Sequence, residues 1–179
     1  MESTFKVTKS MINRYEKTFA FIKKHVPNAT KVLDLGVTNP FSDMMKERGL
    51  EVFNTSGEDL DYQADIVKSF EGIELVTALE ICEHLINPMD VLSKLPCDKL
   101  VASVPLSLWF SKAYRSKTDK WDRHFHEFED WQFDWLLEKA GWEVKASEKW
   151  KNPSGKIGIR PFLRAITPRY YIVYAERVK

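Results

Sequence analysis

The sequence predicts an α/β fold whose doubly wound, mostly parallel sheet of about seven strands has helices on both faces and an antiparallel strand pair at its end. Two observations lead to this prediction. Short apolar runs alternate with segments of helical periodicity, and two long strand-like segments follow the last helical one. Continuous apolar runs such as residues 31–36 are typical of parallel strands that are buried on both faces.

The elements follow one another without an internal repeat. Residues 10–26 place apolar side chains at three- and four-residue steps, which predicts a helix that Ser10 caps and Pro27 ends. The next expected elements are a strand at 31–36, a helix at 41–49, a strand at 51–55, a weak strand near 61–67, a strand at 73–79, a helix at 82–95 interrupted by Pro88, and a strand at 99–104.

The last third of the chain begins with an irregular, aromatic stretch at residues 106–127. A helix at 128–140 follows, and Gly141 stops it. Two strands at 142–150 and 169–178 are long enough to pair antiparallel across the loop between them. Because no linker marks a boundary, we expect residues 1–179 to form one domain.

Composition narrows the class of protein. Lys and Arg number 27 against 26 Asp and Glu, and a net charge of +1 argues against a surface built for polyanions such as nucleic acid. Cys82 and Cys97 form no CxxC pair, which favours a reducing compartment. The N-terminus lacks a signal-peptide core, and no apolar run is long enough to span a membrane. We therefore expect a complete cytoplasmic protein without a membrane partner.

Three motifs appear in a fixed order: VLDLG at 32–36, LVTALEICEHLINP at 75–88, and GWEVKASEKW at 141–150, which follows the predicted helix. In this order the chain resembles the class I S-adenosylmethionine-dependent methyltransferases, and within them the subgroup of ubiquinone-biosynthesis O-methyltransferases and many small-molecule enzymes. The resemblance covers roughly residues 10–179. It implies a Rossmann-like methyltransferase fold and S-adenosylmethionine as the cofactor that donates the methyl group.

The first motif supplies the expected donor site. The carboxyl end of a buried parallel strand opens a crevice at a topological switch point, and Gly36 lets the backbone approach a ligand closely. The resemblance places Asp34 near the methionyl ammonium, although a loop-capping carboxylate is an alternative. Thr38 and Pro40 stand where the family has its second and third glycines. Thr38 still offers a hydroxyl to the donor, but both side chains make the loop bulkier.

The resemblance also implies contacts to the nucleoside. An acidic residue should end the second strand and bind both ribose hydroxyls, but alignment places Ser56 there. Glu58 and Asp59 follow, and we favour Asp59 as the ribose partner, with Glu58 second. Asp65 occupies the position of a family Asp that faces the adenine amino group. The alternative is a solvated acidic turn, with Asp65 a charge at the start of a short helix.

Leu79 and Glu80 end the next apolar run and are expected to line the floor beside the methionyl portion. His84 follows on the first turn of a helix, where relatives place a histidine near the sulfonium. Methyl transfer needs a general base when the acceptor is a hydroxyl, and an imidazole suits that task. The alternative for His84 is a capping and packing role.

Glu80, Glu83 and His84 also share one helical face, which is a possible set of metal ligands. Small-RNA 2′-O-methyltransferases have a similar Glu-x-x-Glu-His site that a later His completes, and His124 or His126 would be that residue here. The same pattern occurs in metal-free relatives as a strand-to-helix junction. The leading prediction is therefore a site without a metal.

Residues 106–127 follow the strand after which the family builds its acceptor pocket, so we expect a lid on the acceptor side. Aromatic faces suit flat or apolar acceptors, and the cations suit a carboxylate or phosphate. The same mix would also suit single-stranded nucleic acid, and a surface lid with a purely packing role is the other alternative. His124, His126 and Glu127 are candidate acid/base groups, and His124 and His126 join His84 as the expected catalytic residues. A second basic cluster on an expected loop comprises Lys156, Arg160, Arg164 and Arg169.

These features lead to one functional prediction and two alternatives. We expect an enzyme that transfers a methyl group from S-adenosylmethionine to a small acceptor, anionic or aromatic, with oxygen preferred over nitrogen or carbon. The first alternative is a non-catalytic binding module that keeps the fold. The missing glycines and Ser56 are the reason to consider it. The second is a metal-dependent RNA 2′-O-methyltransferase, against which the near-neutral charge argues.

Overall fold

The computed structural model describes residues 7–152 and 157–178. Its strands form one sheet in the order β2-β1-β3-β4-β6-β5, with β1 to β4 parallel and β6 antiparallel to both of its neighbours. The mostly parallel sheet and the antiparallel terminal pair confirm the predicted fold class. The strand bounds are β1 (Lys31–Asp34), β2 (Glu51–Asn54), β3 (Leu75–Leu79), β4 (Lys99–Pro105), β5 (Trp142–Lys151) and β6 (Pro168–Arg177).

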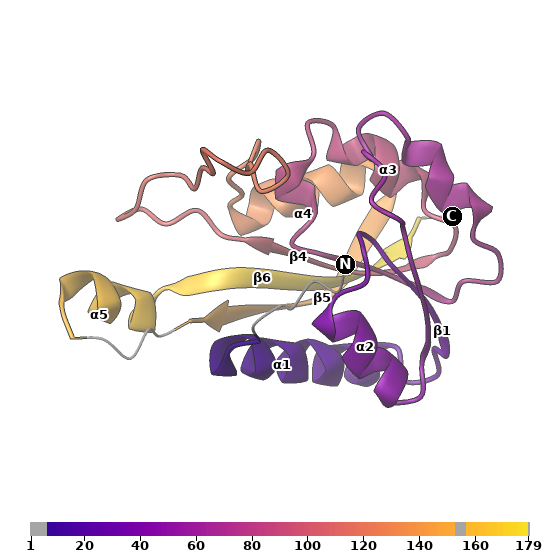
Figure 1. Ribbon diagram of the computed structural model, residues 1–179, viewed down its shortest axis with the longest axis horizontal. Coiled ribbons are helices and arrows are strands. Elements are labelled where there is room, and N and C mark those ends of the chain that lie inside the picture. The colour runs from indigo at the N-terminus through magenta and orange to yellow at the C-terminus, as the bar shows by residue number, and fades with distance from the viewer. Residues whose placement is uncertain (1–6, 153–156, 179) are drawn as a thin grey trace.

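Helices cover both faces of this sheet. Figure 1 shows α1 and α2 on one face and α3 and α4 on the other, while α5 projects beyond the sheet at one end. Two short 3-10 helices, η1 and η2, lie between the strands. The helix bounds are α1 (Lys9–His25), α2 (Pro40–Glu47), η1 (Ala64–Ser69), η2 (Cys82–His84), α3 (Pro88–Lys94), α4 (Asp130–Lys139) and α5 (Ile159–Ile166).

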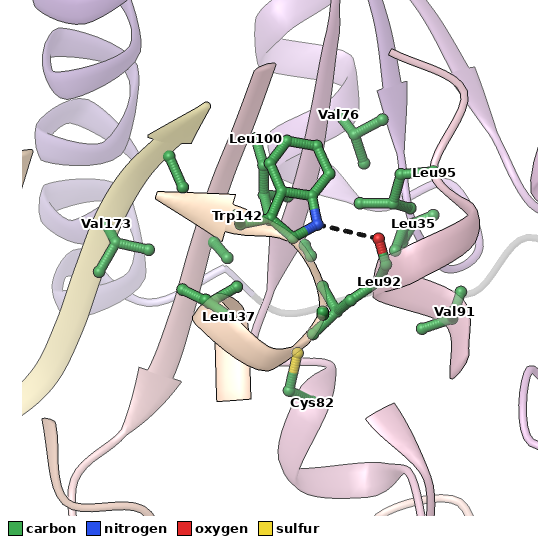
Figure 2. Close-up of a cluster of buried hydrophobic side chains, with 14 of the residues drawn as sticks. Leu35, Val76, Cys82, Val91, Leu92, Leu95, Leu100, Leu137, Trp142 and Val173 are labelled. Carbon is green, nitrogen blue, oxygen red and sulfur yellow. Dashed lines mark hydrogen bonds between the residues drawn. The ribbon is translucent and has the colours of Figure 1, made fainter. Parts of the chain in front are cut away.

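The core on the α3–α4 face surrounds Trp142, which is 1% exposed. Its indole N–H donates a 2.9 Å hydrogen bond to the carbonyl of Leu92, and Leu137 and Leu100 pack nearby (Figure 2). A buried indole needs such a partner, because an unpaired donor costs free energy. On the opposite face, α1 and α2 bury Ile22 and Met45 against the sheet. The two cores hold the carboxyl ends of the strands in place.

The sheet of the described residues has six strands, because the weak strand expected near 61–67 is absent. Residues 59–62 form a turn, and η1 follows. Ala64 and Val67 are the buried residues of η1, and their three-residue spacing fits a 3-10 helix, whereas a half-buried strand would bury every second residue. This spacing explains why the segment leaves the sheet.

Two helix starts also differ from the prediction. Thr8, rather than Ser10, caps α1, since its hydroxyl accepts a 3.3 Å hydrogen bond from the N–H of Met11. The segment 82–95 divides into η2 and α3, with Pro88 in the first turn of α3. A proline there loses no intrahelical hydrogen bond, because the first amides of a helix have no partner.

The loop expected between the last two strands contains a helix, α5, which the sequence prediction missed. None of its residues is buried, and Phe162 and Ile166 are exposed. Arg160 and Arg164 lie on α5 and Arg169 on β6, while Lys156 lies outside the described residues. For residues 7–152 and 157–178, every helix is too short or too polar to cross a membrane.

Candidate functional site

A cavity of about 820 Å³ opens at the carboxyl ends of β1, β2 and β3. This volume lies within the range of small-molecule binding sites. The wall is built by residues that follow these strands, by α1, by β5 and β6, and by the segment 106–127. The lining includes Arg14, Tyr15, Asp34, Gly36, Thr55, Glu58, Asp59, Asp61, Tyr62, Leu79, Glu80, His84, Ser103, Lys120, Trp121, Phe125, Trp150 and Tyr170.

Asp34 ends β1 and is 2% exposed. Its Oδ1 accepts a 2.6 Å hydrogen bond from the hydroxyl of Thr77, and its Oδ2 accepts one of 2.7 Å from Ser42. The amides of Asn39 and Asn54 donate to Oδ2 as well. Burial raises the pKa of this carboxyl, and the four donors oppose that rise. Asp34 therefore joins β1, β3 and the start of α2 beneath the cavity.

Gly36 has a φ of +97° at the cavity wall, a left-handed conformation that glycine adopts without strain. Its N–H donates to the hydroxyl of Thr55 at 2.8 Å. The side chain of Thr38 is exposed and lies outside the lining, where its hydroxyl donates to Asn54. Pro40 is the first residue of α2. The two departures from the glycine pattern therefore leave the cavity open.

The loop after β2 presents Glu58 and Asp59 to the cavity, whereas Ser56 is exposed and lies outside the lining. The carboxylate of Glu58 accepts the N–H of Ser56 at 2.6 Å, and Oδ1 of Asp59 accepts the N–H of Asp61 at 3.2 Å. Thr55, which sequence reasoning missed, is buried at the strand end. Its place at the end of the predicted strand 51–55 is the signal that could have identified it.

Asp65 lies outside the cavity lining, because η1 directs it to the surface. Its side chain is 69% exposed and forms ion pairs with Lys68 and Lys94, which lower the pKa of its carboxyl. Asp61, which the sequence analysis did not single out, lines the cavity instead. Its carboxylate accepts the N–H groups of Ile86 and Asn87 at 2.8–2.9 Å. Asp61 thus fastens the turn at 59–62 to the loop before α3.

Leu79, the last residue of β3, and Glu80, which follows it, both line the cavity. The φ of +57° at Glu80 places a non-glycine residue in the left-handed region, a conformation that costs free energy and marks many functional sites. Its carboxylate accepts hydrogen bonds from Ser103 at 2.9 Å and Arg14 at 3.4 Å. Burial raises the pKa of this carboxyl, while the charge of Arg14 lowers it. Arg14 from α1 is a further cavity residue that sequence reasoning missed.

The three predicted catalytic histidines lie at different places. His84 lines the cavity, and its ring packs edge-on against that of His124, with centroids 4.8 Å apart. His124 stands behind it, outside the lining, and burial together with the charge of His84 lowers its pKa. His126 is also outside the lining, with Nε2 3.2 Å from the carbonyl of Ile86. His84 is therefore the member of this set that a ligand in the cavity would meet.

Glu83 is 1% exposed and lies beneath His84. Burial and the charge of Glu80 raise the pKa of its carboxyl. Its backbone carbonyl accepts hydrogen bonds from the N–H groups of Phe125 at 2.7 Å and His126 at 3.3 Å. Glu83 thus links η2 to the segment 106–127.

The segment 106–127 contributes Lys120, Trp121 and Phe125 to the cavity wall. The side chain of Trp121 is 60% exposed, and Tyr114, which is half-exposed, donates a hydrogen bond to Asp122. The N–H of Tyr114 donates to Glu127 at 2.9 Å. Much of this wall is therefore aromatic surface that is open to a ligand.

Neither a protein-family model nor a curated protein matches the chain. Solved structures do. The 1,6-didemethyltoxoflavin-N1-methyltransferase of Burkholderia thailandensis, solved with 1,6-didemethyltoxoflavin and S-adenosylhomocysteine, is 16% identical, with a TM-score of 0.65 over 92% of this chain and 78% of its own. An S-adenosylmethionine-dependent methyltransferase from Archaeoglobus fulgidus is 18% identical, with a TM-score of 0.58 over 91% and 94%. The chain has the class I methyltransferase fold.

One similar structure is named for a reaction other than methyl transfer. The [4+2]-cyclase SpnF is 14% identical, with a TM-score of 0.54 over 92% of this chain and 81% of its own. Identities this low establish the fold alone, and one fold can support several chemistries. The reaction of this chain therefore depends on the groups that line its cavity.

Proposed function

We propose that the chain binds S-adenosylmethionine in the cavity and transfers its methyl group to a small-molecule acceptor, with oxygen preferred. The open cavity at the carboxyl ends of β1, β2 and β3 carries this proposal, because ligands of such sheets bind at that edge. Support comes from similar structures solved with S-adenosylhomocysteine bound, among them the toxoflavin enzyme.

The donor fits the polar groups of the wall. Its nucleoside would lie over Gly36, with the ribose hydroxyls toward Asp59 and Glu58. Asp59 uses Oδ1 for the backbone of Asp61, which leaves Oδ2 for a hydroxyl. The methionyl part would lie beside Leu79 and Glu80, with its ammonium group toward Asp34, which also lines the cavity.

The acceptor would enter beside the segment 106–127. Trp121 and Phe125 offer aromatic faces, and Lys120 offers a cation, which together suit a flat or anionic molecule. Bound S-adenosylmethionine would supply an electrophilic methyl group, which an acceptor oxygen held at this wall would receive. The acceptor proton passes to the imidazole of His84, the histidine that lines the cavity.

Calorimetry with S-adenosylmethionine and S-adenosylhomocysteine tests donor binding. We expect the wild type to bind both, and Asp59→Asn to bind about 10-fold more weakly because a charged hydrogen bond to the ribose is lost. Asp65→Asn is the matched control, since Asp65 lies outside the cavity lining and should leave the affinity unchanged. Absence of heat at about millimolar ligand would refute the enzyme assignment, because this concentration is far above the dissociation constant expected for a donor site.

A screen of small acceptors with isotopically labelled methyl donor tests the transfer. Label in an ether or ester would support oxygen as the preferred atom, and label on nitrogen or carbon would correct that preference. Donor binding without any transfer would instead favour the non-catalytic binding module.

A further inference from the structure

Three side chains converge behind the cavity wall. Glu83, His84 and His124 each offer one ligand atom, and these atoms lie within 4.8 Å of one another. They come from two segments, since η2 carries Glu83 and His84 while the segment 106–127 carries His124. The 2.7 Å hydrogen bond from the N–H of Phe125 to the carbonyl of Glu83 holds the two segments together.

Glu83 contributes an oxygen that nothing in the described residues satisfies. The residue is 1% exposed, and its Oε2 lacks a hydrogen-bond partner. Its Oε1 lies 3.8 Å from Nε2 of His84. Buried polar groups are ordinarily paired, and buried carboxylates are either paired or bound to a metal. The orphaned oxygen therefore points to a missing cationic partner.

Each histidine has one ring nitrogen that faces an oxygen acceptor of a neighbouring residue. Nδ1 of His84 lies 3.1 Å from the carbonyl of Arg123. Nδ1 of His124 lies 3.8 Å from Oε1 of Glu127, which the N–H of Tyr114 holds in place. Metal-binding histidines characteristically direct one nitrogen to a carbonyl or carboxylate, which leaves the other nitrogen's lone pair for the ion. In this arrangement, Nε2 of each ring is left for an ion.

We propose that Glu83, His84 and His124 bind a Zn²⁺ ion. Two imidazoles and one carboxylate are a donor set that zinc favours, and such three-ligand sites keep a fourth position for water or substrate. Glu80, which the sequence grouped with these residues, is outside the site because its carboxylate bonds to Ser103 and Arg14. Magnesium is a poor match, since it prefers oxygen ligands.

The site adjoins the cavity, because His84 is also a lining residue. If methyl transfer occurs as proposed above, an acceptor oxygen in the fourth position would lose its proton more readily to solvent, and His84 would then act as a ligand rather than as a base. Zinc binding itself does not depend on the proposed function, so it can succeed or fail independently of donor binding.

Metal-free protein titrated with Zn²⁺ by calorimetry tests the site, with Co²⁺ as a spectroscopic substitute. We expect stoichiometric binding, a visible absorption band for Co²⁺, and no competition from Mg²⁺. Glu83→Gln and His124→Gln should each weaken binding by about 100-fold or more, and Glu127→Gln by about 10-fold, because it orients His124. His126→Gln is the matched control and should bind as the wild type does, since His126 is outside the cluster.

Circular dichroism establishes that each variant is folded. Zinc binding that is equally tight in the wild type, Glu83→Gln and His124→Gln would overturn the site, and so would a wild type that binds no zinc. If a glutamine variant fails to fold, the Co²⁺ spectrum of the wild type remains decisive: a low-symmetry spectrum with nitrogen and oxygen ligands supports the site, and an aqueous spectrum overturns it.

Discussion

The two walls of the cavity differ in how their side chains are held. On one wall, Asp34 is 2% exposed and accepts hydrogen bonds from four side chains, which lie on β2, on β3 and at the start of α2. On the other, Trp121 is 60% exposed and belongs to a segment with little regular structure. The first wall is part of the core, while the second is a surface built on it. Changes at the first wall should therefore affect folding, and changes at the second should affect ligand affinity alone.

The largest expected effect follows from Asp34→Ala. The change removes the acceptor for Thr77 and Ser42 and leaves buried donors unpaired, so the free energy of unfolding should fall by about 3 kcal/mol. Urea denaturation measures this loss. Asp43→Ala on the exposed side of α2 is the control, and it should change stability by less than about 0.5 kcal/mol. Equal effects of the two changes would contradict the buried network.

A smaller effect is expected from Gly36→Ala. Alanine at a φ of +97° should cost about 1–2 kcal/mol of stability, and its Cβ would lie 3.4 Å from Ile81 at the cavity wall. Gly49→Ala carries similar backbone strain at a φ of +87°, with nothing within 4 Å of the new Cβ. Both variants should unfold at lower urea concentrations, but Gly36→Ala alone should weaken binding of S-adenosylhomocysteine in calorimetry. Equal affinities would remove Gly36 from the donor site.

On the other wall, Trp121→Ala should leave the unfolding free energy unchanged and raise the KM for an acceptor about 2-fold to 10-fold, as loss of an aromatic contact of about 1 kcal/mol would do. Trp109→Ala tests whether position matters, because Trp109 is 79% exposed and lies outside the lining. Steady-state kinetics should show no change for it. A loss of stability on Trp121→Ala would mean that this wall is also part of the core.

The smallest effect is expected at the opposite end of β1. There Glu74 accepts hydrogen bonds from the N–H groups of Thr30 and Lys31, and these lower the pKa of its carboxyl. A lowered pKa contributes stability above the unfolded value of 4.5, and the contribution is lost as the pH falls through the folded value. Glu74→Gln should therefore destabilise slightly at pH 7 and not in strong acid. Urea denaturation midpoints of the wild type and Glu74→Gln, measured from strong acid to pH 7, test this direction.

Periodicity was sufficient to predict the elements that bury an apolar stripe. The strands that became β1 and β3 are continuous apolar runs, and α1 repeats its apolar residues regularly, so both signals are present in the sequence alone. Prediction from periodicity failed for the segments whose side chains are weakly or irregularly buried. The helix α5 buries none of its residues, and η1 is too short to repeat its pattern more than once.

The candidate site was predicted in part for the same reason. Asp34, Gly36 and Glu80 stand directly at strand ends, so a strand prediction places them at the cavity. Arg14 reaches the cavity from a helix far away in sequence, and Asp61 does so because its turn folds back. Such placements depend on packing between distant elements. The sequence contains no local signal for them.

The carboxylate of Asp61 joins two loops that belong to different strand–helix units, since it holds the backbone of Ile86 and Asn87. A molecule seated against the neighbouring Asp59 would restrain one loop and, through Asp61, the other. Amide hydrogen exchange at Ile86 and Asn87 should consequently slow when the cavity fills, although neither amide needs to touch the bound molecule. Those two backbone protons would then serve as built-in reporters of occupancy.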